Sequence, residues 1–117
     1  MNYVRIFTGD DGISHFEDVE IDLSEAGSAG QQLSKAMAAG SVIFRRNTGS
    51  YDLDWHPAPR KQFVVNLTGE VQITASDGEV RIFGPGSIML ADDTTGQGHR
   101  SKATSDAERL SLFVVLE

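Results

Sequence analysis

The stretch that decides the fold is Asp54-Trp-His-Pro-Ala-Pro-Arg-Lys-Gln-Phe-Val-Val-Asn-Leu-Thr-Gly69. Two prolines one residue apart push the residues before them towards extended conformations, so this stretch begins as extended chain and not as helix. Side chains two residues apart on an extended chain share a face. One face is apolar, with Phe63, Val65 and Leu67, and the other is mixed, with His56, Ala58, Gln62, Val64 and Asn66. An ordinary strand turns its polar face to solvent; here we expect the mixed face to line a cavity instead.

Short extended segments separated by Gly and Asp turns make up most of the rest of the chain. The Asp77-Gly78 pair is typical of a hairpin turn, because glycine takes a positive φ at little cost. This spacing predicts an antiparallel sandwich or barrel. In the Ser- and Gly-rich region 24–40, residues 31–39 predict a short helix or an irregular segment. The expected strands are Tyr3–Phe7, Ile13–Leu23, Ser41–Arg46, Gln62–Leu67, Glu70–Ala75, Glu79–Phe83, Ser87–Ala91, one beginning at His99, and Arg109–Leu116.

Composition limits the kinds of partner. A chain of 117 residues fits one domain with its own core. The formal net charge of −7 argues against a nucleic-acid binder, which needs a basic patch, and against binding to an anionic membrane. With no cysteine, no disulfide or thiolate site can form. No apolar run approaches the length of a membrane span, and no signal-peptide pattern opens the chain, so a cytoplasmic location is the default expectation.

Glycines and histidines recur at motif spacing in the second half of the chain. His56, Gln62 and Gly69 follow Gly49, and a second group is formed by Gly86, Gly96 and His99. These positions resemble the two motifs of small single-domain cupins. The resemblance implies an all-β, antiparallel double-stranded β-helix, the cupin jelly-roll barrel. It implies a single domain over residues 1–117, with the barrel at about 41–116 and N-terminal strands and a loop at 1–40.

The metal motif of that family is altered in this chain. Ala58 stands where the family has its second His, and Gln62 takes the place of the Glu. The spacings are also longer, with Thr94 in place of a Pro and Ala103 in place of an Asn. The resemblance leaves His56, Gln62 and His99 as candidate ligands for a divalent Zn, Ni, Fe or Mn ion, although a neutral amide does not balance the charge of the ion.

Other interpretations of these residues stay open. Asp92 or Asp93 could complete a metal site from the polar loop that follows Ala91. The two histidines could instead be barrel residues that hydrogen-bond to Gln62, Thr94 or water. No organic cofactor is expected.

Two function classes remain, because a cupin fold hosts many chemistries. One is an enzyme for a small organic molecule, with His56 and His99 as the catalytic residues, each a general base or a metal ligand. The other is a non-catalytic module that binds or senses a small ligand, and a structural dimeric barrel is a weaker third class. The candidate ligand-binding residues are Trp55, Arg60, Gln62 and Asn66, with Arg60 placed to reach a carboxylate. A packing Trp and a solvated Arg are the simpler alternatives for Trp55 and Arg60.

Three further sets of residues carry weaker expectations. Arg45 and Arg46 are adjacent, so only one of them can face inward. His15 is expected to be a partly buried strand residue, and Asp52 and Asp54 are expected to be exposed carboxylates.

The strand Arg109–Leu116 has an apolar face formed by its even-numbered residues, as the central strand has with its odd-numbered ones. Two such faces imply that the outer surface of the sheet is covered, by the N-terminal segment or by a second copy, and a homodimer is expected.

Overall fold

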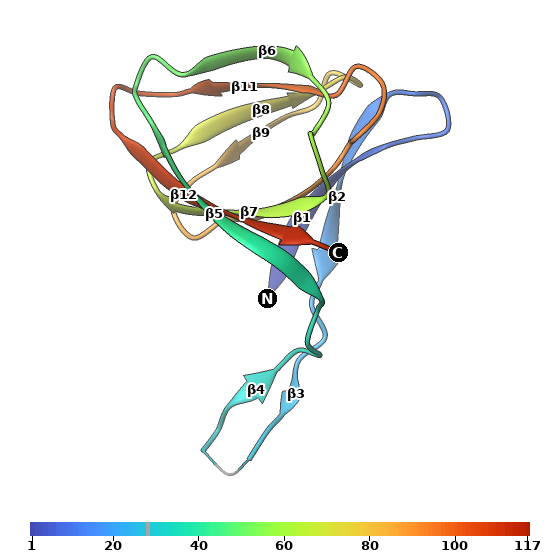
Figure 1. The fold of residues 1–117 in the computed structure, drawn as a ribbon, viewed down its shortest axis with the longest axis vertical. Helices are drawn as coiled ribbons and strands as arrows, with labels where there is room; N and C mark the ends of the chain where they lie inside the picture. Colours follow the sequence, from blue (N-terminus) through green and yellow to red (C-terminus); the bar gives the residue numbers. More distant parts are fainter. Residues whose placement is uncertain (28) are drawn as a thin grey trace.

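The computed structural model describes residues 1–27 and 29–117, and over this part the chain is all-β, as the sequence predicts. The strands form two sheets and a separate strand pair that extends away from both (Figure 1). The larger sheet has the order β2 (Ser14–Glu20), β1 (Asn2–Thr8), β10 (Ile88–Asp92), β7 (Gln62–Thr68), β12 (Arg109–Leu116), β5 (Ala39–Asn47). The smaller sheet has the order β6 (Asp52–His56), β11 (His99–Ala103), β8 (Val71–Ala75), β9 (Val80–Phe83), and the separate pair is β3 (Ser24–Glu25) with β4 (Gln32–Leu33).

The larger sheet is mixed, and here the expectation of a purely antiparallel fold is wrong. β1 pairs with β10 in parallel, which places Val4 beside Met89 and Ile6 beside Ala91. A parallel pair needs a long connection, and the rest of the chain between β1 and β10 supplies it. This pairing brings the apolar inner face of β1 over the core. Across the described residues the strands form separate sheets and not one closed barrel.

The helix considered for residues 31–39 does not form. This segment contains β4, irregular chain and the first residue of β5, and every residue in it is exposed. A short helix needs an apolar face to pack, because its own backbone hydrogen bonds stabilise it only marginally in water. Because every residue of the segment is exposed, no face of such a helix would be packed here. Over residues 1–27 and 29–117 there is no helix with the length and hydropathy needed to cross a membrane.

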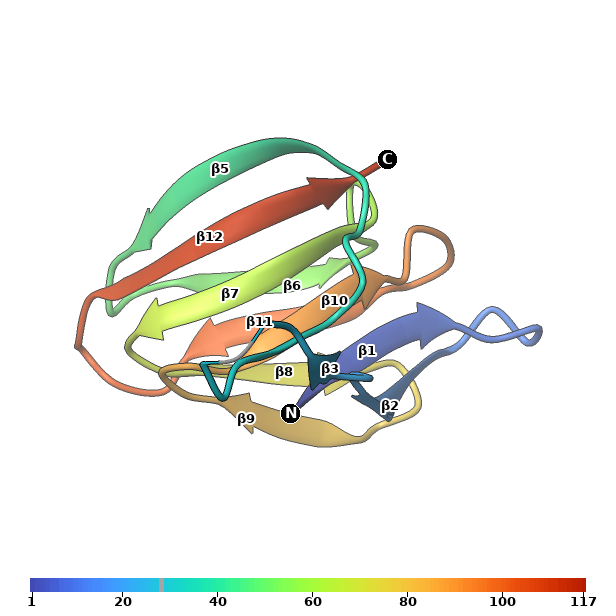
Figure 2. The same ribbon diagram turned by 90° about the horizontal axis from the view of Figure 1, so that it is seen from below.

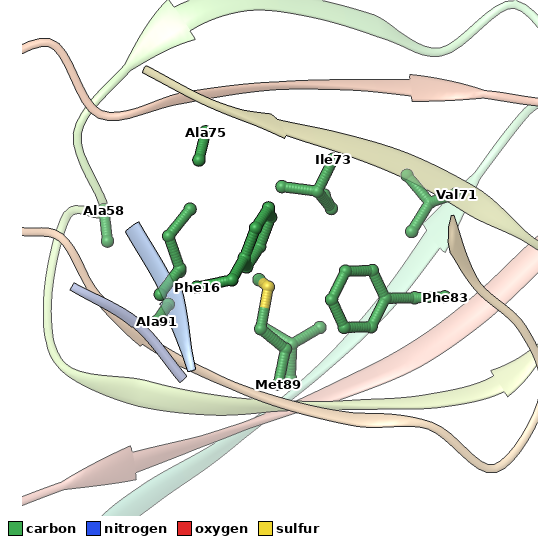
Figure 3. Packing of buried hydrophobic residues seen from close by; sticks show 10 residues of the cluster. Phe16, Ala58, Val71, Ile73, Ala75, Phe83, Met89 and Ala91 are labelled. Atoms are coloured by element: carbon green, nitrogen blue, oxygen red, sulfur yellow. The ribbon is translucent and has the colours of Figure 1, made fainter. Parts of the chain in front are cut away.

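The mixed face of the central strand points inward, as predicted from the alternation of side chains along an extended chain. In β7, Gln62, Val64 and Asn66 are buried, whereas Phe63 and Val65 are only partly buried on the opposite face. Beyond them the core is filled unevenly (Figure 3). Phe83 and Val71 fill one side of the view, and small side chains lie on the other side. Those small side chains are Ala58, Ala75 and Ala91, and two of them, Ala58 and Ala91, line a cavity between the sheets.

The outer face of the larger sheet stays apolar and partly uncovered. The chain segments that lead into and out of the β3–β4 pair cover part of this outer face. There, Leu23 and Met37 line a groove together with Phe63 and Val65 of β7. Towards the β5 edge none of the described residues covers it, and Phe44 is 81% exposed. Phe44 pairs with Leu112 of β12, so the apolar surface runs continuously from the edge strand into the sheet. A surface of this kind marks an interaction site.

We therefore keep the prediction of a homodimer and place its interface on this face. Light scattering at micromolar concentration is expected to give twice the 12.7 kDa mass of the chain. Phe44→Asp should shift the mass towards that of the monomer, because a charge in an apolar interface is left without a partner. Val80→Asp, at a half-exposed position on the smaller sheet, is the matched control and should leave the mass unchanged. A monomeric wild-type mass contradicts the prediction.

Candidate functional site

A cavity of about 410 Å³ lies between the two sheets. Its volume is in the range of sites that bind small molecules. Polar groups gather in two places on a wall that is otherwise mostly apolar. Near the ends of β6 and β7 it is lined by His56, Ala58, Gln62 and His99, and towards the start of β12 by Arg45, Asn47, Tyr51 and Arg109.

The two histidines are brought together by strand pairing. His56 ends β6 and His99 begins β11, and the two residues are direct partners in the antiparallel register. Their ring centroids are 4.5 Å apart. Gly98 makes this approach possible, because its φ is +74° and a Cβ at this position would collide with the carbonyl of His56 and would lie 2.5 Å from Pro57 Cα. The glycine thus lets the end of β6 lie against the start of β11.

Both imidazoles are held through the same ring nitrogen. Nδ1 of His56 lies 2.7 Å from the carbonyl oxygen of Asp54, which can only accept, so this nitrogen carries the hydrogen. Nδ1 of His99 lies 2.5 Å from Oδ2 of Asp93, a fully buried carboxylate. The other oxygen of Asp93, Oδ1, has no hydrogen-bond partner among the described residues. Each neutral ring therefore keeps the lone pair of its Nε2 free for a proton or another ligand.

This arrangement predicts one tautomer for two of the three histidines. In long-range proton–nitrogen correlation spectra, recorded at a pH where the rings are neutral, His56 and His99 should show a protonated Nδ1 and a bare Nε2. Asp93→Asn should alter the nitrogen pattern of His99 and leave that of His56 unchanged. His15 is the internal reference, because it does not line the cavity. Its Nδ1 lies 3.1 Å from Oδ2 of Asp77. A protonated Nε2 on His56 contradicts the assignment.

The donor set around the histidine pair fits a metal ion only in part. Two imidazoles with engaged Nδ1 atoms are typical of metal ligands. Gln62 could add its Oε1, but that oxygen accepts a hydrogen bond from Nη1 of Arg60 at 3.1 Å, and a nearby cation opposes a second one. Over residues 1–27 and 29–117, no three His, Cys, Asp or Glu side chains come together as metal ligands would. Asp93, considered above as a ligand, contacts the ring of His99 instead.

Two arginines occupy the other end of the cavity. Arg109 is 6% exposed; its Nε donates to Oδ1 of Asn66 at 2.7 Å and its Nη1 to Oδ1 of Asn47 at 3.2 Å. Arg45 donates through Nε to Oγ of Ser111 at 3.0 Å, and its guanidinium lies 4.4 Å from the ring centre of Phe113. Burial, and next the positive charge of Arg45, lower the pKa of Arg109 to about 10. Burial also lowers the pKa of Arg45. A pKa of about 10 leaves Arg109 charged at neutral pH.

The structure brings together some of the candidate residues and separates others. His56, Gln62 and His99 line one cavity, and Arg60 reaches it through its bond to Gln62. Trp55 does not lie on the wall; it is 37% exposed, because neighbouring residues on a strand face opposite sides. Asn66 is buried beside the cavity, where its amide binds Gly69 O and Arg109 and so positions that arginine.

The weaker expectations about charged residues are confirmed. Arg45 faces the cavity, whereas Arg46 faces solvent and pairs with Glu108. His15 is partly buried on β2, and Asp52 and Asp54 are exposed carboxylates beside Arg100. Sequence reasoning missed Arg109 as a site residue. The sequence did contain an indication of this role. Arg109, Ser111 and Phe113 are two residues apart, so they share the face of β12 opposite to its apolar even-numbered face.

Comparison with known proteins gives no relative. No known protein family matches the chain, and no curated protein matches it either.

Proposed function

We propose that the cavity binds a small organic molecule and that His56 and His99 act on it by proton transfer. The observation that carries the proposal is the histidine pair, with each Nδ1 held by an oxygen and each Nε2 left free, on the wall of a largely apolar cavity. A neutral Nε2 accepts a proton, and the ring that becomes charged can return it. The cupin resemblance agrees with this proposal, since cupin barrels hold small ligands between their sheets.

The two histidines differ in a way that suits two roles. Asp93 has no other hydrogen-bond partner among the described side chains, so its carboxyl group serves to orient His99. In this geometry a carboxylate orients the imidazole and fixes its tautomer. His56 faces only a neutral carbonyl. We therefore assign His99, the ring that a carboxylate orients, as the first group to accept a proton at Nε2, and His56 as the second group in the transfer.

A first-row metal is the second candidate, and the engaged Nδ1 atoms of both histidines favour it. In that case the metal would polarise the ligand, and the Nε2 atoms of His56 and His99 would hold it. The missing carboxylate and the two arginines on the cavity wall count against a tightly held dication. Metal analysis of the purified protein separates the two candidates.

Solvent exchange at the ligand tests proton transfer directly. Compounds that raise the Tm are first selected from a small-molecule library, since a ligand that binds only the folded state stabilises it. The selected compounds are then incubated with the protein in heavy water, and deuterium at their carbon atoms is followed by NMR. Wild type is expected to exchange ligand hydrogens. His56→Gln and His99→Gln should each slow the exchange about a hundredfold, the size of a lost general base or acid.

His15→Gln is the matched control, because His15 lies on β2 away from the cavity. It should leave both the Tm shift and the exchange rate unchanged. Ligands that bind without any exchange would make the protein a non-catalytic binding module. Binding that is insensitive to both His56→Gln and His99→Gln would overturn the proposal.

A further inference from the structure

The arginines of this chain fall into two groups. Among its seven arginines, four have a carboxylate within ion-pair distance, namely Arg5, Arg46, Arg81 and Arg100. Over the residues that the structure describes, no such partner lies near Arg45, Arg60 or Arg109. These three are the arginines of the cavity: Arg45 and Arg109 line its wall, and Arg60 donates to Gln62. The arginines without an acidic partner are therefore those that a ligand would meet.

This absence of carboxylates is not a shortage of acidic residues. Asp and Glu together number 17 against 10 Lys and Arg. The polar partners of the two wall arginines are nevertheless all neutral: Asn47 and Asn66 for Arg109, and Ser111 for Arg45. Amide and hydroxyl oxygens fix the direction of a guanidinium but leave its charge uncompensated. Burying an uncompensated charge lowers stability, so such a group is expected to have a functional reason.

Several donors of the two guanidiniums are unused. Arg109 engages Nε and Nη1, and Arg45 engages Nε and has Tyr51 as a further polar neighbour, so Nη2 of Arg109 and at least one terminal amino group of Arg45 are left for a ligand. Arg45 and Arg109 are diagonal neighbours on adjacent strands, because Arg45 pairs with Ser111 and Asn47 pairs with Arg109. Diagonal neighbours on one face of a sheet are about 7 Å apart, which leaves room for one anionic group between their side chains.

We infer that the ligand of this cavity carries a carboxylate, which Arg45 and Arg109 bind together. A guanidinium presents parallel N–H donors in a plane, and a carboxylate accepts them in pairs. The inference rests on the proposed function, since it names the chemical class of the molecule that His56 and His99 would act on. Arg60, at the histidine end, lies outside this subsite.

The two polar ends of the cavity set the size of such a molecule. Gln62 marks the histidine end of β7, and Asn66, which holds Arg109, lies four residues further along the strand. Four residues of extended chain span about 13 Å. A molecule whose carboxylate lies between the arginines therefore turns its opposite end towards the imidazoles. The apolar wall between them, formed by Val64, Ile73 and Met89, suits a hydrocarbon or aromatic middle part.

Matched carboxylate and amide pairs test the inference. Benzoate is compared with benzamide, and succinate with succinamide, by thermal shift and calorimetry at neutral pH and constant ionic strength. At least one carboxylate is expected to raise the Tm where its amide does not. Arg45→Gln and Arg109→Gln should each weaken the binding of that carboxylate about tenfold or more, as expected for a lost charge-assisted hydrogen bond. Arg45→Lys should retain part of the affinity, because the charge remains while the paired donors are lost.

Arg46→Gln is the matched control, because Arg46 is the next residue on β5 but faces solvent and pairs with Glu108. It should leave carboxylate binding unchanged. Equal effects of carboxylates and amides would overturn the inference, as would affinities that do not respond to both Arg45→Gln and Arg109→Gln. Stabilisation by inorganic phosphate and by no carboxylate would also overturn it, in favour of a tetrahedral anion.

The outcomes distinguish this inference from the proposed function. If only uncharged compounds bind, and His56→Gln and His99→Gln abolish their exchange, the carboxylate inference falls and the proposed function stands. If carboxylates bind through the arginines but no compound responds to the histidine substitutions, the anion subsite stands and the proposed function falls.

Discussion

Gly98→Ala is expected to lower the free energy of unfolding by about 3 kcal/mol or more, the range of backbone strain combined with a steric clash. The new Cβ would lie 2.5 Å from Pro57 Cα and closer still to the carbonyl of His56, and both obstacles are backbone. Neither can be relieved by a change of rotamer. The chain must then separate the end of β6 from the start of β11 or lose stability. Chemical denaturation followed by tryptophan fluorescence measures the loss.

Gly78→Ala separates the steric effect from the effect of φ. Gly78 has a φ of +95°, but a Cβ there would meet nothing within 4 Å. Its substitution should lower stability by about 1 kcal/mol, the cost of a left-handed conformation for a residue with a side chain. Because His56 is the obstacle at Gly98, the Gly98→Ala protein should also show shifted His56 and His99 NMR signals. Equal losses for the two variants would mean that the close approach at Gly98 does not exist.

Ala58→His combined with Gln62→Glu is expected to create strong metal binding. Ala58 and Gln62 are both buried and line the same cavity as His56 and His99. The two new side chains would therefore extend from the wall that already carries the histidines. The Glu supplies the negative charge that Gln62 lacks, and the third imidazole adds a ligand for zinc or nickel. We expect zinc affinity at least a hundredfold above that of wild type. At a zinc concentration about 100 times the Kd, the metal should stabilise the variant by about 2.7 kcal/mol.

Calorimetry at neutral pH measures the affinity, and a chelator should abolish the added stability. The single substitutions Ala58→His and Gln62→Glu are the controls, and each should bind zinc less tightly than the double variant. Equal affinity of wild type and the double variant would mean that the four positions do not converge on one point. The alignment of residues 56–62 with the cupin motif would then be wrong.

Local chemistry made the strand framework predictable from sequence. Gly and Asp turns fix the ends of most strands, and the parity of β7 shows that Gln62 and Asn66 share a face with Val64. The same alternation of side chains argues against Trp55 as a residue of the candidate site. Once His56 is placed inside, its neighbour on the same strand must face outward.

Other features depend on tertiary contacts that no local pattern contains. The odd-numbered face of β12 mixes Arg109 and Ser111 with Phe113 and Val115, so the sequence places Arg109 on that face but does not show that the face meets the cavity. Asp92 and Asp93 are adjacent, so the sequence shows only that their side chains point to opposite sides. In the structure Asp92 pairs with Arg5, and Asp93 is buried against His99. The parallel pairing of β1 with β10 joins segments that lie far apart in sequence.

The position of β12 has a consequence for synthesis of the chain. β12 lies between β7 and β5 in the larger sheet, although it is made long after either (Figure 2). β5 has no other partner in this sheet among the described residues, so a ribosome that has reached Ala103 carries an edge with Phe44 and Val42 and nothing to pair it. A strand edge with exposed apolar side chains is a site of aggregation until it is paired. The sheet can close only after Leu116 leaves the ribosome, so a nascent chain stalled before β12 should be a substrate for chaperones.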